Sequence, residues 1–256
     1  MKEFNAKETS ERIISFIREY YKKNNLKGAV IGISGGKDSS VVAALFTKAL
    51  GSENVQGIWM PCHSKDIDKK DAYTLANHFG FEISEFDLTN LYDNYVNQIK
   101  GLYSVDDDTL IDANINIKPR LRMLTLYYHA AMLSKVKGGT YIVPGTSNKC
   151  ELYVGYFTKG GDSVSDIQVL ADLTVDEVIK VGEAVGVPSS IVHKTPDDGL
   201  SGKTDEDKLG VKYHDIAEVI NNPESPNVNE DTLKRIRTLH LNNEHKFNIP
   251  TYRKWN

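Results

Sequence analysis

Short apolar runs alternate along the chain with longer segments in which apolar residues recur every three or four positions. The short runs are rich in β-branched residues and predict buried strands, whereas the longer segments predict helices with one apolar face. The predicted strands are residues 29–33, 55–60, 81–88 and 140–144. The predicted helices are residues 7–24, 38–50, 64–79, 89–100 and 120–136. This alternation predicts an α/β fold, with a doubly wound, mostly parallel sheet and helices on both faces.

The ends of these predicted elements carry further expectations. Thr9 or Ser10 is the candidate N-cap of the first helix. Residues 103–116 contain three consecutive aspartates and little periodicity, so we expect an exposed loop. Ligands of such sheets lie beyond the carboxyl ends of the strands. The polar residues 61–64 lie at one such end, where they form either a nucleotide-binding wall or a plain loop.

Composition narrows the classes of function. The 256 residues suit one domain over 1–256, and the formal net charge of −4 gives no basic surface for nucleic acid. Cys62 and Cys150 make neither a disulfide framework nor a C-x-x-C pair, so a reducing cytoplasm is expected. The polar N-terminus argues against a signal peptide, and no apolar run has the length of a membrane span.

A glycine turn joins the first predicted strand to the helix that follows. It reads Ser34-Gly35-Gly36-Lys37-Asp38-Ser39. Paired glycines let successive N–H groups turn inward, and the helix dipole adds positive potential, so the turn predicts an anion site. The Walker A pattern is excluded because Asp38 follows the lysine and Ile31 replaces the first glycine. The plainer alternative is an ordinary corner in which Asp38 and Ser39 only cap the helix.

A second polar stretch follows the fourth predicted strand. Residues 145–166 read GTSNKCELYVGYFTKGGDSVSD. They are rich in glycine, hydroxyl and charged residues, which is typical of an active-site crossing rather than a buried core.

Several motifs together resemble a known family. The S-G-G-x-D-S turn resembles the pyrophosphate loop of N-type ATP pyrophosphatases. With it occur NIKPRLRM at 116–123, GTSNKCELYVGYFTKGGD at 145–162 and TDEDKLGVKY at 204–213. In this order and spacing they resemble NAD⁺ synthetase, in its ammonia-using form without a glutamine amidotransferase domain. The resemblance implies a Rossmann-like fold of the adenine nucleotide alpha hydrolase type.

The resemblance also implies a reaction, the last step of NAD⁺ biosynthesis. Deamido-NAD⁺ would be amidated with ammonia at the cost of ATP, through an acyl-adenylate, with release of AMP and pyrophosphate. Mg²⁺ is the implied cofactor.

A homodimer with its dinucleotide site at the subunit interface is the implied assembly. The predicted helix 120–136, apolar on more than one face, would suit such an interface, although a buried core helix has the same pattern.

Residue roles carry over where the letters match the family. The implied ATP contacts are Gly32, Ile33, Ser34, Gly35, Gly36, Lys37, Asp38, Ser39 and Thr146. The implied Mg²⁺ ligands are Asp38 and Glu151, hard oxygen donors that suit this ion. The implied deamido-NAD⁺ contacts are Arg120, Lys159, Asp166, His245 and Lys246. The implied catalytic set is Asp38, Glu151 and Lys159.

Plainer structural alternatives stand beside these roles. Thr146 can bond the backbone at its strand end, and Asp166 can serve a turn. A solvated side chain or helix start is the alternative for Lys37, Arg120, Glu151, His245 and Lys246.

Two positions depart from the family pattern. Val175 stands where the family often has a lysine that contacts ATP, and Asp197 stands where a nucleotide-binding hydroxyl is expected. Lys194 or Lys203 could compensate. Residues 197–208 are rich in glycine and aspartate and predict a mobile lid.

Two rival functions stay open at this point. One is another N-type ATP pyrophosphatase, either tRNA-thiolating or nucleobase-amidating, although the chain lacks paired cysteines and a basic face. The other is a nucleotide sensor without turnover. The departures at Val175 and Asp197 would suit a sensor. The residues that speak against it are the intact Asp38, Glu151, Arg120 and Lys159.

Overall fold

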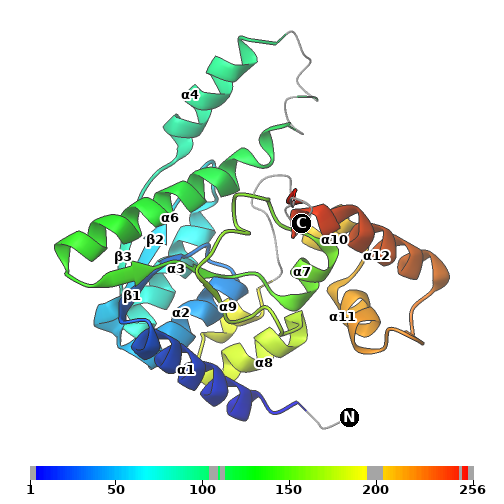
Figure 1. Ribbon diagram of the computed structural model, residues 1–256, viewed down its shortest axis with the longest axis horizontal. Helices are drawn as coiled ribbons and strands as arrows, with labels where there is room; N and C mark the ends of the chain where they lie inside the picture. The colour runs from blue at the N-terminus through cyan, green and yellow to red at the C-terminus, as the bar shows by residue number, and fades with distance from the viewer. Residues whose placement is uncertain (1–3, 104–108, 110–112, 195–203, 248–249, 253–256) are drawn as a thin grey trace.

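A four-stranded parallel sheet in the order β3-β2-β1-β4 forms the centre of the computed structural model (Figure 1). The structure describes residues 4–103, 109, 113–194, 204–247 and 250–252. The central strands are β1 (Leu26–Gly32), β2 (Val55–Trp59), β3 (Glu82–Glu85) and β4 (Thr140–Ile142). A second, two-stranded parallel sheet consists of β5 (Pro144–Gly145) and β6 (Ile167–Gln168). The predicted parallel α/β sheet is confirmed.

Helices connect the strands and continue beyond them. The helices up to the second sheet are α1 (Ala6–Lys23), α2 (Lys37–Leu50), η1 (Ser52–Asn54), α3 (Asp66–Phe79), α4 (Thr89–Lys100) and α6 (Ile117–Val136). The later helices are α7 (Lys149–Val154), α8 (Val175–Val185), α9 (Ser189–Val192), α10 (Asp205–Leu209), α11 (Tyr213–Asn221), α12 (Glu230–Asn243) and η2 (Glu244–Lys246).

Helices cover both faces of the central sheet, as predicted. Successive side chains of a strand point to opposite faces. Ala29 and Ile31 of β1 therefore join the core beneath α1, α2 and α8, whereas Val30 joins a separate core beneath α6. In Figure 1 these two layers lie on either side of the strands. The carboxyl ends of β1 and β2 thus emerge between two packed layers, which holds the following loops in place.

The C-terminal helices form a third cluster of buried side chains. Residues from α7, α11 and α12 pack together, and Cys150, Ile216 and Ile236 are fully buried there. Figure 1 shows this helical lobe beside the sheet, with α7 between the two. The lobe therefore fixes α7, and with it Glu151, relative to the strands.

Several predicted boundaries were wrong. The N-cap of α1 is Asn5, whose side chain accepts from the backbone of Glu8 at 3.1 Å, so neither Thr9 nor Ser10 caps this helix. Helix α6 begins at Ile117, and Pro119 lies in its first turn, where a missing N–H costs little. The third strand ends at Glu85, and the fourth divides into β4 and β5.

Part of the loop predicted at residues 103–116 lies outside the described residues, and residues 113–114 are helical. Most of the predicted lid at 197–208, including Asp197, also lies outside them. None of the helices within the described residues combines the length and apolar character needed to cross a bilayer.

Two rows of exposed apolar side chains lie on neighbouring helices. On α6 they recur every fourth residue, at Leu124, Tyr128, Met132 and Val136. On α4, which projects from the body in Figure 1, they recur in the same way at Leu91, Tyr95 and Ile99. A spacing of four places each row on one helix face. Helix α6 is therefore not a fully buried core helix, and we call these two rows the apolar face.

Candidate active site

The glycine turn between β1 and α2 has a backbone that only glycine adopts easily. Gly35 has φ +79°, and a Cβ there would lie 2.5 Å from the carbonyl oxygen of Asp68. Gly36 is the N-cap of α2 and has no side chain to cap it. The first N–H groups of a helix have no partner within the helix, so they can donate hydrogen bonds to an anion bound at this terminus. Asp38 lies inside the first turn, so the alternative that it merely caps the helix is wrong.

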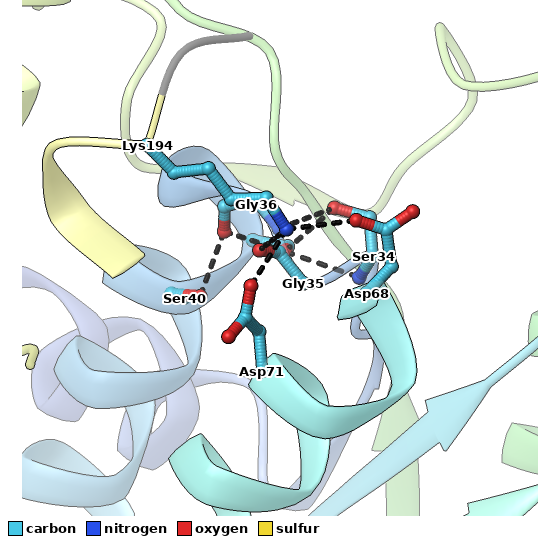
Figure 2. Close-up of polar contacts among 8 residues, drawn as sticks. Ser34, Gly35, Gly36, Ser40, Asp68, Asp71 and Lys194 are labelled. Carbon is cyan, nitrogen blue, oxygen red and sulfur yellow. Dashed lines mark hydrogen bonds and ion pairs between the residues drawn. The ribbon is translucent and has the colours of Figure 1, made fainter. Parts of the chain in front are cut away.

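Hydroxyl groups hold the turn in shape. Ser39 Oγ accepts from the backbone N–H of Ser34 at 3.2 Å, and Ser34 Oγ accepts from that of Gly36 at 3.2 Å. Ser40 Oγ donates to the Gly36 carbonyl at 2.7 Å, as Figure 2 shows. These bonds fix the backbone before any ligand arrives. The turn is therefore preorganised for phosphate oxygens.

The predicted ATP residues lie along one continuous path. Gly32 ends β1, Ile33 is buried just beyond it, and residues 37–39 form the first turn of α2. Lys37 is buried, and its Nζ lies 3.3 Å from Asp38 Oδ2. The alternative of a solvated Lys37 is therefore wrong. Thr146 directly follows β5, a strand that contacts β1.

A buried asparagine connects the two predicted metal ligands. Asn148 Nδ2 donates to Asp38 Oδ1 at 3.2 Å, and the Asn148 backbone N–H donates to Glu151 Oε2 at 3.0 Å. Asn148 also caps α7 with its side-chain oxygen. Our sequence analysis missed Asn148, although the N-x-x-E capping pattern before an apolar run could have indicated it.

The electrostatics of this carboxylate pair favour a bound cation. Burial, and then the charge of Asp38, raise the pKa of Glu151 well above its usual range. Two carboxylates that disfavour each other's charge are stabilised together by a divalent ion. Their hard oxygen donors fit Mg²⁺, which is usually held by one or two carboxylates plus substrate phosphates. Among the described residues no group of three potential metal ligands occurs, so phosphate oxygens would complete this site.

Most of the predicted dinucleotide contacts meet near the C-terminus of the described chain. Arg120 Nε and Nη2 donate to the carbonyl of Lys159 at 3.3 and 3.2 Å. Lys159 Nζ donates to the carbonyl of His245 at 2.9 Å. Lys246 Nζ donates to the carbonyls of Gly155 and Phe157 at 2.7 and 3.0 Å. The four predicted residues Arg120, Lys159, His245 and Lys246 therefore form one connected group.

Asp166 lies apart from that group, at the end of β4. Its carboxylate accepts from the backbone of Val143 at 2.8 Å and bonds the Tyr127 hydroxyl. These contacts match the structural alternative of an aspartate that orders a turn.

Two further cations near the site were missed by sequence analysis. Lys118 Nζ donates to the carbonyl of Cys62 at 2.9 Å and lies 5.1 Å from the Tyr92 ring centroid. Burial lowers the pKa of Arg122, which faces Cys62, Asp162 and Asp68. Their spacing of four within α6 puts both on one helix face, but Lys118 precedes the helix predicted at 120–136, so this signal was missed.

Together, the parallel sheet, the glycine turn at its carboxyl edge and the linked carboxylates define a nucleotide-binding α/β enzyme. A family model described as NAD synthase matches residues 9–250. The chain belongs to the NAD synthase family.

Curated and solved relatives agree with this assignment. The chain is 38% identical to the NH(3)-dependent NAD(+) synthetase of Carboxydothermus hydrogenoformans, over 96% of this chain and 97% of that protein. It resembles the structure of an NMN synthetase from Francisella tularensis, with TM-score 0.88, 30% identity and coverage of 99% and 100%. It also resembles an NH3-dependent NAD synthetase from Campylobacter jejuni in complex with the nitrate ion, with TM-score 0.78, 25% identity and coverage of 98% and 100%.

Proposed function

We propose that the chain is a single-domain, ammonia-dependent NAD⁺ synthetase that amidates deamido-NAD⁺. The observation that carries this proposal is the joining of the glycine turn to Glu151 through Asn148 and Asp38, in a chain similar over its length to synthetases of this activity. A site for an anion alone would not need a carboxylate pair beside it. A site for a triphosphate with Mg²⁺ needs such carboxylates to hold the ion.

The turn and the first turn of α2 bind the β- and γ-phosphates, which leave as pyrophosphate. Asp38 and Glu151 would hold Mg²⁺, which would supply charge neutralisation of the phosphates and polarisation of the α-phosphate. The nicotinate carboxylate attacks the α-phosphorus and forms the acyl-adenylate. Ammonia then attacks the acyl carbon, and AMP leaves with the bridging oxygen. The residues act by positioning and charge, and no covalent enzyme intermediate is required.

Arg120, Lys159 and Lys246 bind the anionic acceptor. Their donors are now directed at backbone carbonyls. Charge-assisted bonds to pyrophosphate or carboxylate oxygens are stronger than bonds to neutral carbonyls. An anionic dinucleotide can therefore draw these cations to itself. Asp166 has a structural role in this proposal, because its carboxylate orders the end of β4.

The proposed assembly is a homodimer formed through the apolar face of α4 and α6. Exposed apolar rows of this size mark interaction sites more often than free surface. A two-fold axis would pair each row with its own copy. The acceptor group begins at Arg120 on the same α6, so the dinucleotide would bind near the subunit boundary. The expected cytoplasmic setting would supply ATP, and its reducing conditions fit the two free cysteines.

A second candidate acceptor is nicotinate mononucleotide. The observation that favours it is the likeness to the NMN synthetase structure, whose TM-score of 0.88 exceeds the 0.78 of the NAD synthetase. The same activation and amidation would apply to either carboxylate. Deamido-NAD⁺ carries an additional AMP half, which nicotinate mononucleotide lacks.

The experiment offers both acceptors in parallel with ATP, Mg²⁺ and ammonium. We expect matched formation of NAD⁺ and AMP, with kcat/KM for deamido-NAD⁺ about tenfold or more above that for the mononucleotide, because its AMP half adds binding energy. A higher kcat/KM for the mononucleotide would identify the mononucleotide as the acceptor instead. AMP release that requires tRNA or another acceptor, or ATP binding without AMP, refutes the proposal.

A further inference from the structure

Lys194, two residues after the end of α9, connects its own segment to α3 and to the glycine turn. Its Nζ lies 2.7 Å from Asp68 Oδ1 and 2.6 Å from Asp71 Oδ2, both on α3. The same atom donates to the carbonyl of Gly35 at 3.4 Å. Figure 2 shows this ammonium group among the two carboxylates and the turn. Lys194 takes no part in the proposed steps of adenylation and amidation.

The contact with Gly35 bears on how the turn binds anions. A phosphate-binding turn must present N–H groups to the ligand and keep carbonyl oxygens away from it. Gly35 lies against the backbone of Asp68, and its carbonyl oxygen is bound by Lys194. The start of α3 and the Lys194 ammonium therefore both contact the turn at Gly35.

The two aspartates pose an electrostatic problem for a site that binds triphosphate. Their side chains are only 20% and 14% exposed, so water screens them weakly. Without a cation they would repel the phosphates. Burial lowers the pKa of Lys194, but hydrogen bonds to both carboxylates outweigh it, so the net shift is upward. The ammonium group therefore stays charged between them.

We propose that Lys194 is a positioning residue for ATP binding, which neutralises Asp68 and Asp71 and holds the Gly35 carbonyl away from the phosphates. It acts through the aspartates and the turn, without touching the nucleotide. This inference rests on the proposed function only in that ATP occupies the turn.

The test compares a variant that removes the charge of Lys194 with one that also removes the charges of both aspartates. Lys194→Met is expected to weaken binding of Mg²⁺ with α,β-methylene-ATP by about 10- to 100-fold, since two weakly screened carboxylates then face the triphosphate. The KM for ATP rises by the same factor, while kcat and the KM for deamido-NAD⁺ stay unchanged. Lys69→Met is the matched control, because Lys69 lies on α3, the helix that carries both aspartates, and pairs with Glu85 at 2.7 Å, away from the turn.

Rescue distinguishes positioning from direct contact. Adding Asp68→Asn and Asp71→Asn to Lys194→Met removes the repulsion, so nucleotide affinity should return toward that of the wild type. If this triple variant binds as weakly as Lys194→Met, Lys194 is itself a phosphate ligand and the proposal is overturned. Unchanged nucleotide binding in Lys194→Met also overturns it.

A second variant decides the matter if Lys194→Met does not fold. The double variant Asp68→Asn, Asp71→Asn keeps Lys194 and should bind the analogue at least as tightly as the wild type. Weaker binding would mean that the aspartates themselves serve the nucleotide, which contradicts the proposal. The analogue binds without an acceptor or turnover. A wild-type chain that binds it but fails to amidate therefore refutes the proposed function and leaves this inference testable.

Discussion

The phosphate half of the candidate site, between β1 and α2, and the proposed acceptor half, between α6 and η2, are held together by different means. In the phosphate half, hydroxyls and backbone groups within a few residues fix the turn. In the acceptor half, long cationic side chains donate to carbonyls of distant segments, as Lys159 does to His245. The first half offers N–H groups that are already placed, whereas the second must exchange its carbonyl partners for an anion.

This contrast indicates which half depends on the rest of the molecule. The turn is supported by the sheet, α3 and Lys194 within one chain. The acceptor group depends on packing of the C-terminal lobe and begins on the helix that carries the apolar face. Loss of a proposed metal ligand from the phosphate half should therefore lower kcat directly. Changes in the acceptor half should act mainly on acceptor affinity.

The largest expected effect is the loss of a proposed metal ligand from the phosphate half. Glu151→Gln should lower kcat by about 10²- to 10³-fold, a magnitude typical of removing one electrostatic contact to the transition state. Glutamine can keep the capping box, so α7 should remain folded. The control is Glu177→Gln, since Glu177 holds the equivalent capping position on α8. Steady-state AMP release measures both, and equal losses in the two variants would contradict the assignment.

The next effect separates the halves through acceptor affinity. Arg120→Met should raise the KM for deamido-NAD⁺ by about 30-fold or more, because a charged partner of the acceptor is lost. The KM for ATP should not change. Arg18→Met is the control, since Arg18 also donates to two carbonyls but lies on α1, away from the site. A parallel rise in the ATP KM would show that the two halves are not separate.

A smaller effect is expected from the apolar face. Tyr128→Asp buries a charge in the proposed interface, so the dimer should dissociate at concentrations where the wild type stays associated. The acceptor KM should then rise about tenfold, and nucleotide binding should persist. Phe16→Asp, at an exposed position on α1, is the control. Sedimentation velocity reports the assembly, and a wild-type monomer that turns over normally would refute this part.

The smallest effect concerns stability in alkali at the edge of the acceptor half. Burial, and then Asp166, raise the pKa of Tyr127 to about 12. Between about pH 10 and 12 the unfolded chain loses this proton while the folded chain keeps it. The free energy of unfolding therefore falls as pH rises through this window, and the contribution is fully present below it. Tyr127→Phe should reduce that slope in urea unfolding series, whereas Tyr103→Phe, at an exposed position, should not.

The phosphate half was the more predictable from sequence because its contacts are local. Strand, glycine turn and helix follow one another within residues 26–50, so spacing alone indicates their arrangement. Lys194 lies 126 residues from its partner Asp68, and no local pattern reports such a contact. Arg120 and Lys159 could be proposed only through a resemblance, since their meeting depends on tertiary packing. The helices after residue 173 were not predicted, although capping boxes at Thr174 and Thr204 mark two of them.

The central claim is that the carboxylate is activated on the α-phosphate while the glycine turn holds the departing pyrophosphate. Deamido-NAD⁺ carrying ¹⁸O in its nicotinate carboxylate tests it directly, with mass spectrometry of the products. The account predicts one ¹⁸O atom in each AMP formed and none in pyrophosphate. Label in a phosphate released alongside ADP, or AMP without label, would contradict it.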